Sequence, residues 1–235
     1  MGGGGIYAGG GATLSLKDST VRDNVTHNGV DGAGIYVFQN GTLSVERSTI
    51  SGNVAANVGG GLRMLGSGSI TNSTFSGNTA VAWHGSARFV TDGVLAVVNS
   101  TISGNTAPTG ASAVFLGTFT DASSTLSIAN TIVGQNSDIG CFVAPWGAGL
   151  VTLNSGGHNV LTDATCNPVS SDLVVGDPGV AALADNGGPT ATQALVPGSP
   201  AVDSADGAQC PATDQRGVAR PQGAGCDVGA FEQTP

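Results

Sequence analysis

Charge, aromatic rings and long apolar runs are all scarce in this chain of 235 residues, of which 10% are charged and 5% are aromatic. Seven Lys and Arg stand against 16 Asp and Glu, for a net charge of −9, so the chain lacks the basic surface that a phosphate backbone requires. No apolar run approaches the roughly 18 residues that span a bilayer. We therefore expect neither a nucleic-acid partner nor a membrane span in this chain.

The sequence is instead rich in glycine, with 39 residues, and it carries a repeated phrase. Short apolar groups alternate with Gly, Ser, Thr and Asn, a pattern typical of short strands joined by tight turns. The phrase Ser-Thr-Ile-Ser-Gly-Asn recurs, in full or in weaker form, at residues 19–24, 48–53, 73–78, 100–105 and 130–136. Such self-similarity is the signature of a solenoid, in which each repeat buries its apolar side against its neighbours.

The second repeat predicts the shape of one coil. It contains three short strands with alternating side chains, at residues 34–37, 42–45 and 48–51. Three strands per coil predict an all-β fold, a right-handed parallel β-helix with about five regular coils. A closed coil leaves unpaired strand edges only at the two ends of the solenoid.

Equivalent positions in successive repeats predict inward ladders of apolar side chains. The first ladder comprises Ile6, Ile35, Leu62, Ala87 and Ala113. The second comprises Leu16, Val45, Ile70, Val97 and Ile128, and the third Val21, Ile50, Phe75, Ile102 and Ile132. A further series, in turns, comprises Asn24, Asn53, Asn78, Asn105 and Asn136. We expect this series to form a structural asparagine ladder that bonds one turn to the next.

The repeat fades near residue 140, so we predict regular coils over residues 1–140 and irregular final coils with a C-terminal cap over residues 141–235. All four cysteines lie in the second part: Cys141, Cys166, Cys210 and Cys226. They lack the close spacing of a zinc or redox motif, and an even number in a loop-rich segment favours disulfides made in an oxidising compartment. Pairing of sequence neighbours is the simplest of three connectivities, with Cys210 and Cys226 pinning the cap. Free buried thiols are the alternative.

The N-terminal residues read as the middle of a coil. Met1 runs directly into Gly2 and the glycines before Ile6, without a signal peptide or an atypical first repeat. We therefore expect a fragment of a longer secreted protein, with its N-terminal cap missing and Met1 added.

The Gly-Gly-Gly-Ile and Ser-Thr-Ile-Ser-Gly-Asn phrases resemble those of bacterial secreted β-helix proteins of the polymorphic outer-membrane-protein type, across residues 3–136. The tail resembles the choice-of-anchor Q module in phrases at residues 185–190, 198–203, 214–217 and 227–232. The resemblance implies a secreted or surface-displayed scaffold, and it implies no catalytic residues because the family is defined by its fold.

One candidate binding site lies on the outside of the first strand of each coil. Tyr7, Tyr36, Arg63 and Arg88 are predicted at equivalent outward positions, with Phe38 two residues beyond Tyr36. Coils roughly 4.8 Å apart would join them into a stripe that stacks on an extended glycan and clamps uronate carboxylates. We expect an extracellular glycan or another surface ligand, and a monomer. In the alternative interpretation these side chains only occupy exposed strand positions, where aromatics are favoured.

The same stripe suggests an enzyme as the alternative function. A polysaccharide lyase needs a base and a group that neutralises a carboxylate, and Arg63, Arg88, Tyr36 and His84 are the candidates. A glycoside hydrolase is less favoured, because it needs two converging carboxylates and nothing brings acidic residues of different coils together. We expect no metal and no cofactor.

Two further hypotheses concern surface residues. A third outward series, Thr20, Thr49, Thr74, Thr101 and Thr131, resembles the hydroxyl array of ice-binding solenoids. Trp83 and Trp146 lie outside the regular repeats. If exposed, they are natural platforms for sugar rings, and if buried, they fill gaps in irregular coils.

Overall fold

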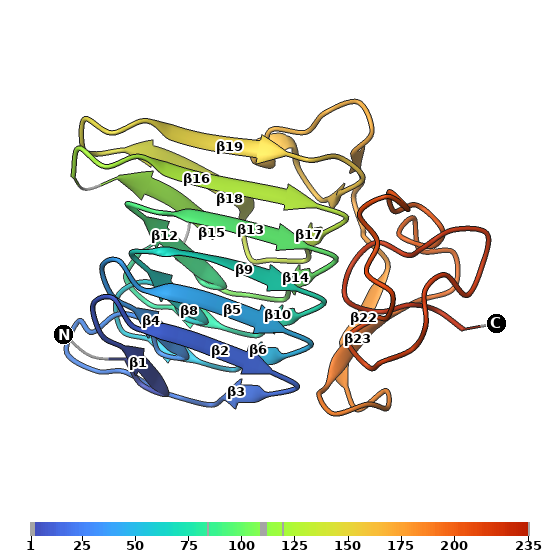
Figure 1. Cartoon of the computed structure of the whole chain (residues 1–235), viewed down its shortest axis with the longest axis horizontal. Coiled ribbons are helices and arrows are strands. Elements are labelled where there is room, and N and C mark those ends of the chain that lie inside the picture. Colours follow the sequence, from blue (N-terminus) through green and yellow to red (C-terminus); the bar gives the residue numbers. More distant parts are fainter. Residues whose placement is uncertain (1–2, 84, 109–111, 119, 235) are drawn as a thin grey trace.

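The computed structural model describes residues 3–83, 85–108, 112–118 and 120–234, without the side chains of Arg88, Phe89, Thr91 and Ser112. Within these residues the chain winds into a parallel β-helix. Its coils stack along one axis, so that their strands form three long sheets parallel to this axis (Figure 1). Strands of successive coils pair in parallel. The fold class predicted from the repeats is therefore confirmed.

We name the three sheets the first, second and third faces, in the order in which the chain reaches them. The first face contains β1 (Ile6–Ala8), β4 (Ile35–Val37), β8 (Leu62–Met64), β12 (Arg88–Thr91), β15 (Ser112–Thr118) and β18 (Ile139–Pro145). The second contains β2 (Thr13–Lys17), β5 (Thr42–Glu46), β9 (Ser67–Thr71), β13 (Val94–Val98), β16 (Ser124–Ala129) and β19 (Val151–Ser155). The third contains β3 (Thr20–Arg22), β6 (Thr49–Ser51), β10 (Thr74–Ser76), β14 (Thr101–Ser103), β17 (Ile132–Gly134), β20 (Val160–Leu161) and β21 (Leu173–Val174). A short pair, β7 (Val54–Ala55) and β11 (Thr79–Ala80), follows the third face.

The corners on either side of the third face explain the repeated phrase. The residue before each Ser-Thr pair has positive φ, as in Asn72 (46°) and Asn99 (44°), and asparagine tolerates this left-handed conformation. At the other corner Gly52 (63°) and Gly77 (65°) take the same conformation without a Cβ penalty. A serine then locks the first corner, since the hydroxyl of Ser73 donates to the carbonyl of Thr71 at 2.8 Å. The phrase therefore encodes two sharp turns around a three-residue strand.

The asparagine ladder is confirmed. The side-chain amide of Asn53 donates to the side-chain oxygen of Asn78 at 2.9 Å, and Asn78 donates in the same way to Asn105 at 3.0 Å. The ends of the ladder, Asn24 and Asn136, make equivalent bonds. Each inner amide also reaches a backbone carbonyl, so the buried polar groups are satisfied along the axis.

The inward ladder of the second face is confirmed in full. Leu16 pairs with Val45, and the series continues through Ile70 and Val97 to Ile128. These side chains belong to the main hydrophobic core, which runs through the inside of the coils. Burial of this continuous apolar column is the main stabilising contribution to the fold.

The last rung of the third ladder was assigned to the wrong residue. Ile102 pairs with Val133 instead of Ile132, and Ile132 takes the outward position next to Thr101. The reason lies in the preceding corner. Thr131 is the counterpart of a corner serine, because its hydroxyl donates to the carbonyl of Ala129 at 2.8 Å. The strand therefore begins one residue later than the apolar pattern indicates.

A short segment at residues 162–172 closes the C-terminal end of the coils. It contains η1 (Ala164–Cys166), and Cys166 is bonded to Cys141 of β18. The Asp163 carboxylate accepts the backbone N–H of Gly140 at 2.7 Å, and Thr165 Oγ1 accepts that of Cys141 at 2.9 Å. This end cap satisfies donors of the last first-face strand that would otherwise stay unpaired.

Residues 176–234, which we name the lateral segment, do not close the end of the solenoid. They lie along its side, against the third face, and contain one antiparallel hairpin, β22 (Val180–Ala184) and β23 (Thr192–Leu195) (Figure 1). The sequence led us to expect this segment at the end of the coils. It packs on the flank because apolar residues of the third face continue into it: Ile132 and Val160 share a buried cluster with side chains that include Val228 and Phe231.

Corner asparagines of three successive coils hold the lateral segment. The side-chain amide of Asn72 donates to the carbonyl of Thr213 at 2.7 Å, and that of Asn130 to the carbonyl of Asp206 at 3.1 Å. Between them, Asn99 reaches the carbonyl of Asp227 at 3.4 Å. The predicted second disulfide, Cys210–Cys226, lies within the segment, so both neighbour pairings are confirmed.

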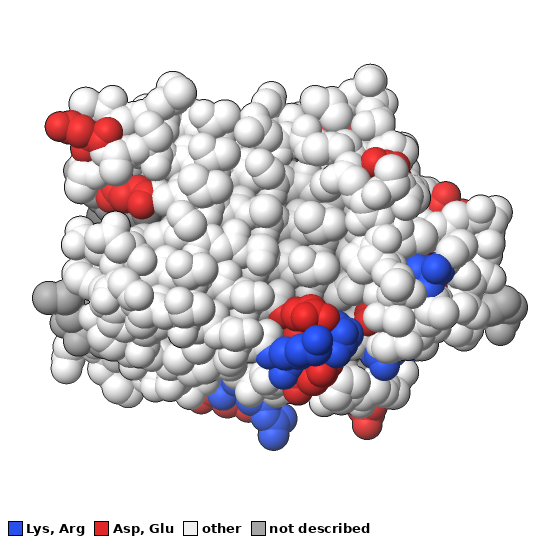
Figure 2. Space-filling view, in the orientation of Figure 1, with Lys and Arg blue, Asp and Glu red and all other residues white. Residues whose placement is uncertain are grey.

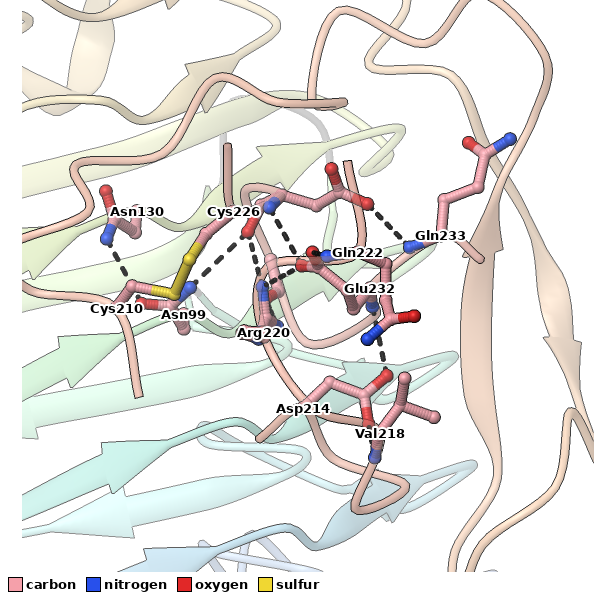
Figure 3. Close-up of polar contacts among 12 residues, drawn as sticks. Asn99, Asn130, Cys210, Asp214, Val218, Arg220, Gln222, Cys226, Glu232 and Gln233 are labelled. Atoms are coloured by element: carbon pink, nitrogen blue, oxygen red, sulfur yellow. Dashed lines mark hydrogen bonds and ion pairs between the residues drawn. A yellow bond between two sulfur atoms is a disulfide. The ribbon is translucent and has the colours of Figure 1, made fainter. Parts of the chain in front are cut away.

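Buried charges organise the interior of the lateral segment (Figure 3). Arg220 forms an ion pair with Glu232 at 3.0 Å, and both side chains are fully buried. The guanidinium also donates to the carbonyls of Asp227 and Gly229, at 2.6 and 2.7 Å. Burial raises the pKa of Glu232 and of Asp227, although backbone N–H donors oppose the shift. Burial likewise lowers the pKa of the Arg220 guanidinium.

Candidate functional site

The lateral segment covers the middle of the threonine series of the third face, although Thr20 at its start is exposed. Thr49, Thr74 and Thr101 are buried, and each exchanges a hydrogen bond with the segment. The Thr74 hydroxyl donates to Gln215 Oε1 at 2.7 Å, for example. The hypothesis that this series binds ice is therefore wrong, because these hydroxyls face protein instead of solvent. They serve as docking points for the lateral segment.

The outward series of the first face follows the predicted register for three coils and then departs from it. Tyr7 pairs with Tyr36, and Tyr36 pairs with Arg63. The next position belongs to Phe89, one residue beyond the predicted Arg88. The glycine and apolar residue that mark the start of this strand in earlier coils are missing here, so the sequence offered no register. The side chains of Arg88 and Phe89 lie outside the described part of the chain.

Pairing extends this outward series to six coils. Its members are Tyr7, Tyr36, Arg63, Phe89, Phe115 and Phe142. Sequence analysis missed Phe115 and Phe142, because they lie beyond the coil in which the register was lost. The same slip affects the inward ladder of this face, since Leu62 pairs with Arg88 and Arg88 with Val114, instead of the predicted Ala87 and Ala113.

The middle of this series is closed to solvent. Tyr36 is 6% exposed and Arg63 is 7% exposed, whereas Tyr7 is 46% exposed. A Cβ added to Gly32 would meet the Cβ atoms of Tyr36 and Arg63 at 2.8 and 3.1 Å, so the backbone of that corner lies directly over the sheet. Arg63 Nε also faces Asp31 Oδ2 at 3.3 Å. The continuous exposed stripe predicted from the sequence is therefore interrupted in its middle.

Aromatic rings remain accessible at one end of the first face, on the first two coils. Tyr7 and Tyr36 meet edge to face, with ring centroids 5.5 Å apart, and Phe38 lies 6.5 Å from Tyr7. Tyr36 is thus the buried support on which Tyr7 and Phe38 are presented. Such edge-to-face pairs hold each ring in one orientation.

A second aromatic platform lies at the other end of the same face. Trp146 directly follows β18, and its ring stacks on Phe115 with centroids 4.8 Å apart and an angle of 26°. Phe142 lies 6.0 Å from Phe115. Trp146 is nevertheless 50% exposed, so one part of its ring is fixed by protein while another part faces solvent. Trp83 is 58% exposed, which places both tryptophans among the surface residues.

Of the residues considered for catalysis, Tyr36 and Arg63 lie side by side on neighbouring strands, but neither is open to a substrate. Tyr36 and Arg63 are buried, and the carboxylate of Asp31 is shared between Arg63 and Asn57. His84 lies outside the described residues. Among the residues that are described, no group of three or more His, Cys, Asp or Glu side chains is arranged to hold a metal ion. The described residues also include no helix that could cross a membrane.

The outer side of the second face carries little charge (Figure 2). Charged groups gather in one patch near the ends of β2 and β5, where Arg47 binds Asp18 through two bonds of 2.8 Å and Glu46 through one of 2.7 Å. Lys17 contacts Glu46 at 3.3 Å. The hydrogen bond from Arg47 lowers the pKa of Asp18, and the same bond raises the pKa of Arg47. The positive and negative side chains of this patch therefore neutralise one another.

Comparisons with known proteins agree with this architecture. The sequence matches the family described as "Right handed beta helix region" over residues 3–173. The matched range ends within β21, the last third-face strand, and leaves out the lateral segment. No curated protein and no solved structure matches the chain.

Proposed function

Because the chain belongs to the right-handed β-helix family, we propose that it is an extracellular scaffold that binds glycan through exposed aromatic rings on its first face. Membership of the family establishes the fold, whereas the ligand depends on the side chains exposed at the surface. The proposal includes display at a bacterial surface, in the manner of an adhesin, and function as a monomer. Two disulfides support the extracellular part, since such bonds persist in oxidising compartments.

The single observation that carries the proposal is the state of Trp146. Its ring is half exposed and yet stacked on Phe115, so the stacking contact favours one orientation of the ring before a ligand arrives. A sugar ring presents an apolar C–H face, which gains free energy when it covers an aromatic ring. A ring already held in place loses little conformational entropy on binding. Rigid, exposed aromatics therefore suit the recognition of sugars.

The spacing of the two platforms indicates an extended ligand. Tyr7 lies on the first strand of the first face and Trp146 follows the last of its six strands. With strands roughly 4.8 Å apart, the platforms are about 24 Å from each other along the axis. A glycan of several sugar units could contact both.

The charge of the first face favours a neutral glycan over a uronate polymer. Arg63 is buried and paired with Asp31, so its guanidinium does not reach a carboxylate of a surface ligand. This observation also weakens the polysaccharide lyase alternative, which needs Arg63 and Tyr36 in contact with the substrate. We therefore give the binding scaffold preference over the enzyme.

The test is binding of the purified protein to an array of neutral and acidic glycans, followed by titration of the best neutral ligand. We expect Trp146→Ala to weaken binding at least about 10-fold, as is typical for the loss of a central aromatic contact. Trp83→Ala is the matched control, because Trp83 is similarly exposed but precedes β12, which is two strands from β18 in the sheet.

Tyr7→Ala should weaken binding of long glycans more than of short ones, since only long chains reach both platforms. Absence of binding to every glycan on the array would overturn the proposal. Equal affinity of the wild type and the Trp146→Ala variant would overturn the assignment of the site.

A further inference from the structure

A groove of about 330 Å³ lies at the seam between the second face and the lateral segment. The second face contributes hydroxyl groups and the neighbouring corner to one wall, from Ser44, Glu46, Arg47, Ser69, Thr71 and Asn72. The lateral segment contributes the other wall, from Pro211, Ala212 and Thr213. A cavity of this volume is within the range of small-molecule sites. It lies on a different face from the aromatic platforms, beside the charged patch of Figure 2.

The groove exists because the corner residue changes along the solenoid. In the later coils this corner is an asparagine that clasps the lateral segment, as Asn72 does with the carbonyl of Thr213. In the first two coils the same left-handed position holds Asp18 and Arg47, whose side chains bond to each other instead. The Pro211–Thr213 stretch is therefore clasped by a corner side chain only at Asn72, whereas beside Arg47 a different part of the segment is bonded, since the Thr190 hydroxyl donates to the carbonyl of Arg47 at 3.1 Å.

The walls of the groove are rigid. The carbonyl of Ala212 accepts the backbone N–H of the buried Arg220 at 3.0 Å. The disulfide Cys210–Cys226 fixes the chain immediately before Pro211. On the opposite wall, Ser44 and Ser69 occupy paired positions on neighbouring strands. A ligand would meet a preformed surface, which reduces the conformational entropy lost on binding.

The chemistry of the lining indicates a neutral, hydroxyl-rich ligand. Arg47 directs three of its nitrogens to Asp18 and Glu46, and Lys17 offsets the remaining negative charge. No uncompensated charge is thereby offered to an anion or a cation. Serine and threonine hydroxyls both donate and accept hydrogen bonds, as the hydroxyls of a sugar do. Pro211 and Ala212 add an apolar wall against which C–H groups can pack.

We propose that this groove is a second ligand site, which binds one residue of a neutral saccharide between the hydroxyl wall of the second face and the Pro211–Thr213 wall. The site does not depend on the first-face platforms, since none of its lining residues belongs to the first face. Glu46 and Arg47 mark one end of the groove and orient the saccharide through their remaining hydrogen-bonding capacity. The other end opens onto the uncharged second face.

The experiment is a titration of the isotope-labelled protein by NMR with methyl glycosides of glucose, galactose, mannose and N-acetylglucosamine. Glucuronic acid serves as the charged probe. At least one neutral glycoside should shift the backbone amides of Ser69, Thr71 and Thr213. Ala212→Trp should abolish these shifts by filling the groove. Ala208→Trp, on an exposed part of the same segment, should leave them unchanged.

A second variant keeps the test independent of the size of tryptophan. Ser69→Val removes one hydroxyl and should weaken binding about 2-fold to 10-fold, the usual range for one neutral hydrogen bond. Ser15→Val, at the same outward register two coils away, should have no effect.

The proposal would be overturned by any of three results. These are no shift with any neutral glycoside, tighter binding of glucuronic acid, and shifts that survive Ala212→Trp. Loss of binding in Trp146→Ala but not in Ser69→Val would point to the first face instead.

Discussion

The coils and the lateral segment are stabilised in opposite ways. In the coils the same contacts recur at each turn: a rung of apolar side chains, an amide of the asparagine ladder and a strand pairing. In the lateral segment each contact occurs once, as with the buried Arg220–Glu232 pair and the Cys210–Cys226 bond. Repetition distributes stability over many weak contacts, whereas the segment concentrates it in a few. The coils should therefore tolerate the loss of a single side-chain contact better than the lateral segment does.

The largest expected effect comes from truncation. A chain ending at residue 140 loses the end cap, the whole Cys141–Cys166 disulfide and the last strands of the second and third faces, so its open edge should cause aggregation. A chain ending at residue 174 keeps all of these and should remain soluble with its coils folded. Size-exclusion chromatography and circular dichroism compare the two. A soluble, cooperatively melting 1–140 chain would show that the end cap is dispensable.

Removal of Arg220 should have the next largest effect. Arg220→Ala leaves the buried carboxylate of Glu232 without its ion pair, and such a loss costs about 3–5 kcal/mol. We expect the lateral segment to detach before the coils unfold, which appears as two transitions in denaturant. Arg22→Ala is the control, because Arg22 is exposed and its contact with Asp23 spans 3.8 Å. A single transition with an unchanged midpoint in Arg220→Ala would show that the stability of the lateral segment does not depend on this ion pair.

A smaller effect is expected inside the asparagine ladder. Asn78→Ala removes side-chain bonds to two neighbouring rungs and to the carbonyl of Ile50, with a cost of about 2–3 kcal/mol in the free energy of unfolding. Asn24→Ala, at the exposed end of the ladder, should cost less than about 1 kcal/mol. Chemical denaturation measures both values. Equal costs at the two positions would mean that the ladder does not act through burial.

The smallest effect concerns pH. Burial raises the pKa of Glu232 and Asp227 above their ordinary values of 4.5 and 3.8. Their contribution to stability is therefore present in full below those ordinary values, and it is lost as the pH rises through the folded-state pKa. Docking of the lateral segment should therefore weaken as the pH rises through the folded-state pKa values of these two carboxyls. Hydrogen exchange of the segment, relative to the coils, measures this difference, and Glu232→Gln should reduce it.

The coils could be predicted because each coil repeats the same contacts with its neighbours, and the repeated phrases in the sequence mark the residues that make them. The corner phrase and the apolar alternation identified the strands, the second-face register and the asparagine ladder. The register was lost at Arg88, where the strand lacks its glycine signal, and it slipped at Thr131, where threonine replaces the corner serine. Both errors occur where the sequence departs from the repeated phrase, so they are errors in aligning the repeats and leave the predicted fold unchanged.

The surface was far less predictable than the core. Tyr36, Arg63 and Thr49 take the outward positions expected of them, and all three are buried. Their coverage comes from a corner loop and from a segment distant in sequence, neither of which carries a repeat. The contact of Thr49 with Ala191, for example, joins residues 142 positions apart. Periodicity indicates which way a side chain points, but it contains no information about what lies opposite.

The bonds from Asn72, Asn99 and Asn130 to the lateral segment also determine how the molecule responds to force. A bare solenoid pulled along its axis can peel one coil at a time, since each coil is held only by its neighbours. The lateral segment is bonded to these three coils and, through Thr49, to the coil before them, so the load is shared in parallel. A pull along the axis must detach the segment before those coils separate, which makes this flank a mechanical splint.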